Sequence, residues 1–474
     1  MTVNGLMLAL GGPLALAALP AAAAADLPAL RVSGNSRFLV TTDGAPFFWL
    51  GDTAWWLRRL APADVTYYME HRARQGFSLI QVHPGYAVED YAGNRAFLED
   101  DPGRPNEAFW ANMDAIVAAA RDHGLYIALV PMWGQEYGEA FGADVAKARS
   151  FGVWIATRYA GLSHVLWIVS GEYDSINGFR LPISAEQKAV LNAVAEGLRE
   201  VHHGTQLMTV HPGVARSSSV DFHAATWLDL NMLQSGHTIS CAAWGLAENW
   251  ELIAHDYGLT PAKPVLDGEP IYEDTPDAIW IERDINRPRA DAHAVRTKAY
   301  WSVFTGACGH TYGHNDVYGF FAPAYPGQVV DIAEGPGQRG SWRAALDAPG
   351  GTQMRHVRAL MESRPFGTGV PDPSLVVGES PAGPDHVAAT RATDGSYAML
   401  YVPRGQPLTV TLDHLCGDRL VAWWFDPRTG NALRALECQR RGEREFAPPT
   451  SGDDQDWVLV LDDAARGYPA PGSA

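Results

Sequence analysis

One pattern recurs between about residues 36 and 365: a short apolar, β-branched run that ends in polar or aromatic residues, followed by a helical stretch. Such runs occupy residues 47–56, 77–86, 125–134, 165–174, 207–214, 229–237, 263–270 and 307–316. Continuous apolar runs are typical of strands covered on both faces. The intervening segments 112–124 and 185–203 carry helical spacing and a stop signal. Eight strand-then-helix units predict a (β/α)8 barrel over residues 36–365.

The spacing of the units supports this prediction. The 260 residues from Asp52, at the end of the first run, to Tyr312, in the last, cover seven units of about 37 residues each, which is close to the usual size of a barrel unit. The alternative is an open, doubly wound sheet. That fold carries a glycine-rich phosphate turn after its first strand, which the segment LGDTAWW (50–56) lacks.

A second domain is predicted after the Gly- and Pro-rich segment 366–374, where the helical period ends. Short alternating runs follow at residues 386–392, 396–403, 408–415, 419–430 and 456–463. Regular short strands separated by turns favour an antiparallel β-sandwich. We expect this domain to cover residues 372–465, to pack on the barrel and to contribute stability more than chemistry.

The N-terminal segment has the character of a secretory signal. Residues 6–25 are apolar and end in small residues, with cleavage expected near Ala25, although no Lys or Arg precedes them. We therefore expect a signal peptide over residues 1–25 and a secreted or periplasmic protein, with a membrane anchor as the weaker alternative. Four cysteines fit an oxidising compartment, in which Cys416 and Cys438 could pair.

Charge excludes two classes of partner. The chain carries 36 Lys and Arg against 54 Asp and Glu, a formal net charge of −18. Electrostatic binding to nucleic acid or to an anionic membrane is therefore not expected. Sixteen Trp and seventeen Tyr are many for this length, and flat aromatic faces suit sugar rings. A carbohydrate is the expected partner, while the oligomeric state stays open.

Polar and aromatic side chains gather where the predicted strands end, and the active site of a (β/α)8 barrel forms at that face. We expect one pocket lined by Asp52, Trp55, His83, Trp133, His211, Gln234, Tyr312 and His314. Two carboxyl groups among aromatic residues favour glycoside hydrolysis, in which one group protonates the leaving oxygen and the other attacks or activates water. Glu172 follows the fourth strand and Glu269 the seventh, so the two can face each other across the barrel mouth.

Four segments carry a resemblance to a known family. They are RFLVTTDGAPFFWLGDTAWW (37–56), LWIVSGEYD (166–174), PVLDGEPIYE (264–273) and WWFDPRTG (423–430). Together they resemble the apiosidase-like glycoside hydrolases, once classed as a domain of unknown function and followed by a domain named for collagen binding. These enzymes fall in the retaining (β/α)8 glycosidase clan, in which strands four and seven carry the acid/base and the nucleophile.

The resemblance implies a secreted hydrolase that acts on plant pectic side chains and releases an apiose-linked sugar. It implies Glu172 as acid/base and Glu269 as nucleophile. In the acidic segment around Glu269, we expect Asp267 and Tyr272 to orient or hydrogen-bond the nucleophile, Tyr272 also to bind substrate, and Glu273 to be a loop charge without a catalytic part. The sequence departs from the family before the acid/base, where Ser170 and Gly171 stand in place of Gly-Gly. That departure leaves the linkage specificity open.

Two other functions are compatible with the sequence. One is a glycosidase of the same fold acting on another pentoside or furanoside, and the other, of a different class, is a non-catalytic carbohydrate- or matrix-binding protein. The segment GHTYGHND (309–316) holds two His four residues apart but on a strand-to-loop run, so no metal and no cofactor are expected. A Ser-His-Asp hydrolase would need a G-x-S-x-G elbow, which the sequence lacks.

Overall fold

The N-terminal part of the protein is a (β/α)8 barrel. The computed structural model describes residues 26–175, 182–324, 336–378 and 380–473. The barrel strands are β4 (Trp49–Thr53), β5 (Leu79–Val82), β6 (Tyr126–Leu129), β7 (Val165–Ile168), β8 (Met208–Thr209), β10 (Asn231–Gln234), β11 (Val265–Asp267) and β12 (Gly309–Tyr312). They are parallel in the order β8-β7-β6-β5-β4-β12-β11-β10. The backbone N–H of Asp229, just before β10, donates to the Met208 carbonyl at 2.9 Å and joins the two ends. The predicted barrel is confirmed.

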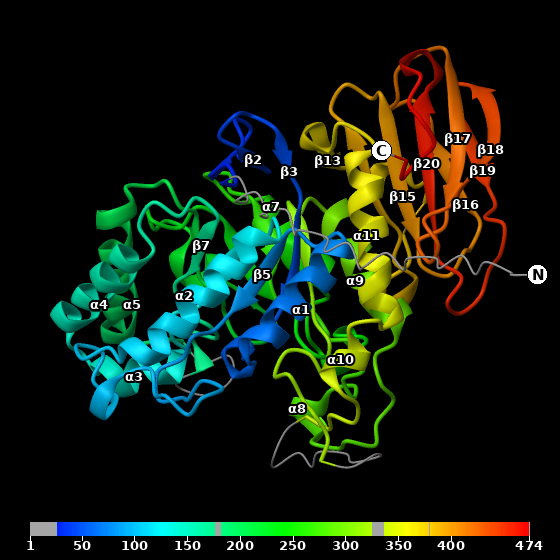
Figure 1. Cartoon of the computed structure of the whole chain (residues 1–474). Coiled ribbons are helices and arrows are strands. Elements are labelled where there is room, and N and C mark those ends of the chain that lie inside the picture. The colour runs from blue at the N-terminus through cyan, green and yellow to red at the C-terminus, as the bar shows by residue number, and fades with distance from the viewer. Residues whose placement is uncertain (1–25, 176–181, 325–335, 379, 474) are drawn as a thin grey trace, which may run out of the picture.

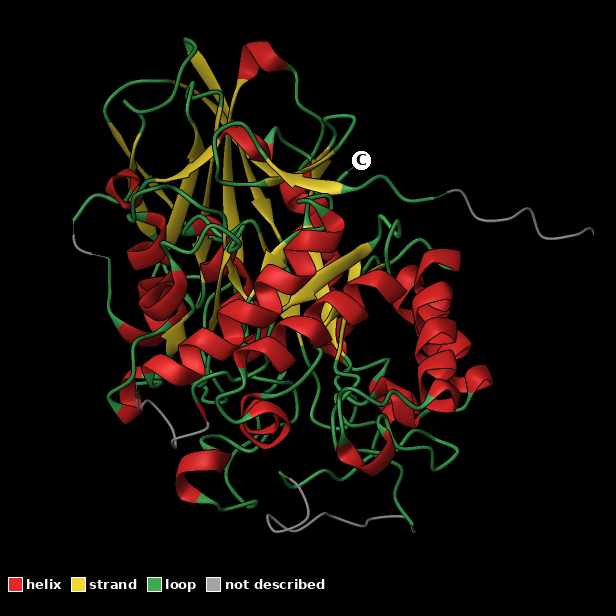
Figure 2. Cartoon of the chain, turned by 90° about the vertical axis from the view of Figure 1, so that its left-hand side faces the viewer, coloured by secondary structure: helices red, strands yellow, loops and turns green. Residues whose placement is uncertain are grey.

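Helices surround these strands, as Figure 2 shows in red. The longer ones are α1 (Pro62–Arg74), α2 (Glu107–Asp122), α3 (Gly134–Phe141), α4 (Val145–Arg158), α5 (Ala185–His202), α7 (Asn249–Tyr257), α9 (Ala292–Phe304) and α11 (Pro349–Glu362). Shorter ones are α6 (Ser219–Phe222), α8 (Ile279–Glu282) and α10 (Trp342–Ala345). Strand β9 (Arg216–Ser217) pairs antiparallel with β10. A three-stranded sheet of β1 (Leu30–Val32), β2 (Leu39–Thr41) and β3 (Pro46–Phe47) precedes the barrel.

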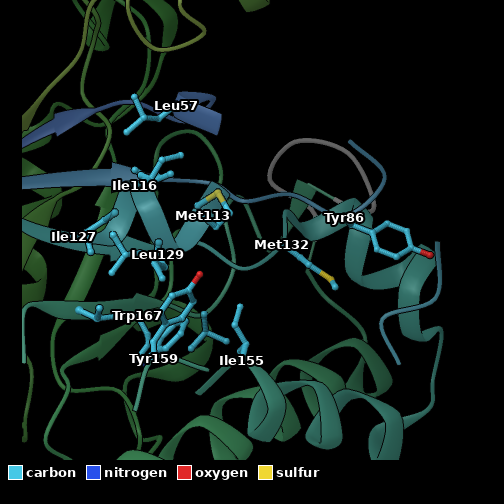
Figure 3. Packing of buried hydrophobic residues seen from close by; sticks show 14 of the residues in the cluster. Leu57, Tyr86, Met113, Ile116, Ile127, Leu129, Met132, Ile155, Tyr159 and Trp167 are labelled. Atoms are coloured by element: carbon cyan, nitrogen blue, oxygen red, sulfur yellow. The ribbon is translucent and has the colours of Figure 1, made fainter. Parts of the chain in front are cut away.

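Burial explains why the strands are continuous apolar runs. Every residue of β5, β6 and β7 is buried, because one strand face meets the barrel interior and the other meets the helices. Figure 3 shows part of this core, where Met113 and Ile116 of α2 and Ile155 of α4 pack near Ile127 of β6 and Trp167 of β7. The core thereby fixes the strands whose carboxyl ends carry the polar side chains.

The C-terminal part is an antiparallel β-sandwich, as predicted. One sheet has the order β13 (Gly369–Pro371), β14 (Ala388–Ala392), β15 (Tyr397–Val402), β20 (Trp457–Asp463), β17 (Arg419–Phe425) and β18 (Ala432–Gln439). The second sheet pairs β16 (Leu408–Thr411) with β19 (Glu443–Phe446). A core of its own lies between the sheets. Strands β13, β18 and β19 were not among the predicted runs.

The sandwich packs against the barrel through α9 and α11, which lie beside β13 and β15 in Figure 1. The rings of Tyr300 on α9 and Tyr401 on β15 stack with centroids 4.9 Å apart. Arg364 forms a buried ion pair with Asp462 at 2.7 Å. Apolar residues of both domains belong to a single buried cluster. The two domains therefore share part of their core.

Two expectations from the sequence have different outcomes here. All four cysteines lie in the described part of the chain and are free thiols, so the pairing of Cys416 with Cys438 is not present. The expected signal segment, residues 1–25, lies outside the described residues. Among the helices that are described, none has the length and apolar character needed to cross a membrane.

Candidate active site

A cavity of about 1020 Å³ opens at the carboxyl ends of the barrel strands. Both Glu172 and Glu269 line it, as do three of the predicted rim residues, Trp55, His83 and Trp133, and also Tyr272, which was expected to orient Glu269. Cavities of this size accommodate small ligands with a few oriented polar groups. The two carboxyl groups that the sequence singled out therefore share one space.

Glu172 lies four residues after Ile168, the last residue of β7, and its backbone has a φ of 37°. Its Oε2 accepts a hydrogen bond from Trp133 Nε1 at 3.2 Å, and its Oε1 accepts one from Gln234 Nε2 at 3.1 Å. Burial raises the pKa of Glu172, and the negative charge of Glu269 raises it further. These effects favour the protonated form, which a general acid needs.

Glu269 follows β11 and is surrounded by donors. Its Oε1 accepts hydrogen bonds from Tyr272 Oη at 2.5 Å and from His237 Nε2 at 3.1 Å, while His211 Nε2 lies 3.0 Å from Oε2. Burial alone would raise the pKa of Glu269, but the hydrogen bonds and charges of His211 and His237 outweigh it and hold the pKa well below its usual range. Glu269 is therefore ionised, as a nucleophile must be.

His211 connects the two carboxyl-bearing residues. The backbone N–H of Glu172 donates to His211 Nδ1 at 3.4 Å, and the opposite ring nitrogen faces Glu269. An Nδ1 that accepts a hydrogen bond leaves the ring proton on Nε2, which lies 3.0 Å from Glu269 Oε2. The ring thus orients Glu269 relative to the backbone of Glu172.

Comparison with known proteins identifies the family. A family model described as "Apiosidase-like, catalytic domain" matches residues 33–368. The chain belongs to the apiosidase-like family. A second model, "Putative collagen-binding domain of a collagenase", matches residues 370–462. A search of curated protein sequences gives no significant match.

Solved structures agree with this assignment. A structure titled "Glycoside hydrolase" is 31% identical, with a TM-score of 0.84 over 93% of this chain and 98% of that one. A glycoside hydrolase family 5 structure from Bacteroides vulgatus is 32% identical, with a TM-score of 0.83 over 94% of this chain and 95% of that one. The protein is thus an apiosidase-like glycoside hydrolase.

The apiosidase-like site contains a third carboxylate that the sequence analysis missed. Glu136, in the first turn of α3, lines the cavity and lies 2.9 Å from His83 Nε2 through its Oε2, which also accepts the Trp133 backbone N–H at 2.6 Å. Burial would raise the pKa of Glu136, but His83 outweighs it and keeps the pKa low. In the sequence, Glu136 looks like an ordinary acidic residue of a helix N-terminus, so only its pairing with His83 could have revealed it.

Three predicted rim residues lie elsewhere in this apiosidase-like barrel and do not line the cavity. Asp52 is fully buried, and its Oδ2 accepts hydrogen bonds from Tyr68 Oη at 2.5 Å and Arg72 Nε at 2.7 Å. Tyr312 donates to Glu273 Oε2 at 2.6 Å. His314 lines a separate hollow of about 850 Å³. A position at a strand end does not decide which side of the sheet a side chain faces, so the expectation of one pocket is wrong for these three.

Two further expectations concern the acidic segment after β11. Asp267 does not contact Glu269 in the structure: its Oδ2 accepts a hydrogen bond from Ser235 Oγ at 2.7 Å, and burial raises its pKa to about 6. Glu273 is not a loop charge, because it is buried and accepts the backbone N–H groups of Gly350 and Gly351 at 3.0 and 3.2 Å. Of the residues expected to orient Glu269, only Tyr272 touches it.

The remaining predicted residues, His211 and Gln234, are buried beneath the cavity, where each contacts one of the carboxyl groups. His237, which also stands at a strand end, is a second ring beside Glu269. Within the described residues, no group of three His, Cys, Asp or Glu side chains is placed to hold a metal ion. The arrangement offers a ligand in the cavity one carboxyl group whose pKa is raised and one whose pKa is lowered.

Proposed function

We propose that this enzyme is a retaining glycosidase of plant-type pectic oligosaccharides, with Glu172 as acid/base and Glu269 as nucleophile. The proposal rests on one observation: the pKa values of these two carboxyl groups are shifted in opposite directions within one cavity. The pKa of Glu172 is raised by burial and by Glu269, and that of Glu269 is lowered by its two histidines. Pairs of carboxyl groups whose environments separate their pKa values mark the acid and the base of a site.

The first chemical step forms a bond between a Glu269 oxygen and the anomeric carbon of the substrate. The bond from that carbon to the leaving oxygen breaks, and Glu172 transfers its proton to this oxygen. Oε1 of Glu269 is held by Tyr272 and His237, whereas the one polar side-chain atom close to Oε2 among the described residues is His211 Nε2. Oε2 is therefore the oxygen with lone pairs free for attack.

The second step returns the enzyme to its starting state. Once Glu269 is esterified, its negative charge is gone, so the pKa of Glu172 falls and its carboxylate can accept a proton from water. The resulting hydroxide oxygen bonds to the anomeric carbon, and the bond to Glu269 breaks. Two inversions at the same carbon give net retention of the anomeric configuration.

The choice of substrate rests on the family. A pectic side chain, with release of an apiose-linked sugar, is what the apiosidase-like resemblance implies, and another pentoside or furanoside is the alternative. We also propose export from the cell, which fits the apolar segment 6–25 and a substrate too large to enter a cell.

The stereochemistry of the first product tests the mechanism. Proton NMR of the first-formed anomer should show retention for the wild-type enzyme. Glu269→Gln should abolish formation of the covalent intermediate on every substrate, whereas Glu172→Gln should spare glycosylation by substrates whose activated leaving groups need no proton. Glu139→Gln, an exposed carboxylate on α3, is the matched control. An inverted product, or near-normal turnover by Glu269→Gln, would rule out the assignment.

A screen of aryl pentosides and pectic oligosaccharides, read by released monosaccharide, tests the substrate. Release of apiose supports the proposed substrate, and selective release of another sugar supports the alternative glycosidase. If no member of the screen is cleaved while oligosaccharides still bind, the protein is a carbohydrate-binding relative of the family rather than an enzyme of this substrate class.

A further inference from the structure

The second hollow of the molecule, of about 850 Å³, lies where the barrel meets the sandwich. The barrel contributes the loops after β11 and β12 and the first turns of α9 and α11, while Arg428 and Asp454 come from the sandwich. Glu172 and Glu269 line the other cavity, at the carboxyl ends of the strands. The polar groups of the second hollow therefore have no part in the proposed glycosidase steps.

His314 forms part of the wall of this hollow and has one ring nitrogen to spare. The residue is only 5% exposed, and its Nδ1 accepts the backbone N–H of Asp316 at 3.0 Å. An Nδ1 that accepts a hydrogen bond leaves the ring proton on Nε2. Among the described residues, none provides an acceptor for this Nε2–H. A buried donor without an acceptor is costly, so an oxygen atom of a ligand in the hollow would stabilise the ring.

Two arginines of the same wall share a single carboxylate. Arg289 Nη1 lies 3.2 Å from Asp274 Oδ2, and Arg339 Nη2 lies 2.5 Å from Asp274 Oδ1. The Arg289 side chain is 14% exposed and that of Arg339 is 54% exposed, so one guanidinium lies inside the hollow and the other at its mouth. Two positive charges thus face one negative charge.

The other charged side chains of the wall have partners of their own. Arg296 pairs with Asp454 and Asp456, and Arg428 pairs with Asp426. The carboxylates of Glu273, Asp291 and Asp316 accept backbone N–H groups of residues 350 and 351, 294, and 339 and 340. Burial raises the pKa of Glu273 and raises that of Asp316 to about 6, which reduces the negative charge that these two add. Asp274 is therefore the carboxylate that pairs with Arg289 and Arg339, and one of their charges is left over.

The electrostatic environment of His314 agrees with this count. Burial and the charges of Arg72, Arg339 and Arg289 lower the pKa of His314 to about 3, so the ring is neutral at ordinary pH. The arginines that disfavour a second proton on the ring would equally stabilise a negative charge beside its Nε2–H. A ligand that meets both the N–H and the arginines is therefore an anion.

We propose that this hollow is an anion site, in which a phosphate or sulfate group accepts the His314 Nε2–H and pairs with Arg289 and Arg339. Guanidinium groups suit such oxyanions because their donors match two oxygens at once. The group belongs either to a free inorganic anion or to an ester on a glycan. The site does not depend on the glycosidase function. Since both domains line the hollow, a bound anion stabilises the folded full chain.

Equilibrium dialysis of the full chain against radiolabelled inorganic phosphate and sulfate tests this inference. Chloride keeps the ionic strength constant, so that only specific binding is measured. We expect saturable binding of one anion per chain. Arg339→Gln should weaken it about tenfold, as the loss of a charge-assisted pair implies, and Arg339→Lys should retain part of it. Because Arg339 is exposed, these variants leave the core of the fold unchanged. His314→Phe should weaken binding as well.

Asp274→Asn changes the affinity in the opposite direction. The substitution removes the shared negative charge, and Asn tolerates the backbone φ of 63° at this position. Anion binding should become several-fold tighter, because the arginines then lack their carboxylate partner. The matched control is Arg343→Gln, which removes a 47% exposed arginine of α10 that pairs with Asp64 and should leave the affinity as it is.

Three results would overturn the inference: no saturable binding, an affinity unchanged by Arg339→Gln, or no gain in Asp274→Asn. Binding that is lost in Arg59→Gln but kept in Arg339→Gln would also overturn it, because Arg59 lines the active-site cavity instead. Galactose 6-sulfate separates the two sources of the anion. Tighter binding of this ester than of inorganic sulfate, abolished by Arg339→Gln, supports a glycan ester, and weaker binding supports a free anion at the same site.

Discussion

At the scale of single residues, the site combines a strained backbone at Glu172 with opposite pKa shifts of Glu172 and Glu269. The φ of 37° at Glu172 lies in the left-handed region, which costs a residue with a Cβ about 1–2 kcal/mol. Such strain persists where the surrounding contacts fix it, and it is concentrated at functional sites. Here Trp133 and Gln234 hold the carboxyl group, and His211 accepts the backbone N–H. Neither the strain nor these contacts can be recognised in the segment VSGEYD alone.

His237 provides a test of how Glu269 is kept ionised. Its ring lowers the pKa of Glu269, so the acid limb of kcat/KM for the wild-type enzyme should lie at low pH. In His237→Ala the pKa of Glu269 rises towards its usual value, and activity should be lost at a higher pH as the medium is acidified. A pH profile on an activated aryl glycoside measures this shift.

The control for this prediction is His255→Ala, because the His255 side chain is 66% exposed on α7. Its acid limb should coincide with that of the wild type. An unshifted acid limb in His237→Ala would show that His237 does not set the protonation of Glu269.

At the scale of elements, the turn after β7 has to pass close to the Trp133 ring. A Cβ on Gly171 would lie 2.2 Å from two carbons of that ring, so this position has no room for a side chain. The departure from the family pattern, Ser170 before Gly171, is tolerated because Ser170 is buried and donates to the Gly171 carbonyl at 3.1 Å. Of the two positions before Glu172, only Gly171 is required to be glycine, because only there would a Cβ collide with the Trp133 ring.

Gly171→Ala should therefore displace Trp133 and its hydrogen bond to Glu172. We expect kcat/KM to fall about 10- to 100-fold, because small misplacements of catalytic groups have effects of this size. Circular dichroism should show an intact fold. Gly138→Ala, on α3 with open space around its Cβ position, should retain wild-type activity. Wild-type activity in Gly171→Ala would contradict the proposed role of Trp133.

Helix α11 is tied to the catalytic loop by Glu273. The carboxylate accepts the N–H groups of Gly350 and Gly351 in the first turn of α11 and the hydroxyl of Tyr312. Glu273 directly follows Tyr272, so this contact also fixes the residue that holds Glu269. A helix N-terminus favours a negative charge at this place.

Glu273→Ala should lower the free energy of unfolding by about 1–3 kcal/mol, because three buried donors lose their acceptor. Urea unfolding followed by fluorescence measures the loss. Glu362→Ala, at the exposed end of the same helix, removes a surface pair with Arg358 and should cost about 0.5 kcal/mol or less. Equal stability of the two variants would show that Glu273 does not anchor α11.

At the scale of the whole molecule, the sandwich completes the packing of the barrel. The Tyr300–Tyr401 stack and the Arg364–Asp462 pair cross the boundary, and Arg296 on α9 pairs with Asp456 at 2.8 Å. These side chains are buried, so a barrel without the sandwich would expose apolar surface and leave charges unpaired. Removal of one partner of a buried ion pair is strongly destabilising.

Truncation after residue 368 should accordingly give a barrel that aggregates or melts at a lower temperature than the full chain. Tyr401→Ala should lower the melting temperature of the full chain, because the substitution leaves a cavity beside Tyr300. Leu433→Ala, on the half-exposed strand β18, should change it little. A soluble truncated barrel with an unchanged melting temperature would refute the shared core.

The sequence by itself determined the architecture of both domains. Strands covered on both faces are mostly apolar, so all eight barrel strands were visible as runs, and β16 and β17 alternate because one face of each meets the sandwich core. Strands β15 and β20 are buried along their whole length, because their other face belongs to the core shared with the barrel. Strand β18 was missed because most of its residues are exposed, and its pairing with β17 alone makes it a strand. The sequence also singled out Glu172 and Glu269, since each stands in the polar end of one of these runs.

Only the tertiary structure decided which side chains share the cavity. Asp52, Tyr312 and His314 stand at strand ends like Trp55 and His83, but register and neighbours such as Arg72 turn them away from it. Glu136, Arg58 and Arg59 enter the cavity from a helix and a turn that no strand pattern marks. The physical reason is that the hydrophobic periodicity of the sequence records which faces of a helix or strand are buried. The direction and the partner of a polar side chain depend instead on residues that are far away in the sequence.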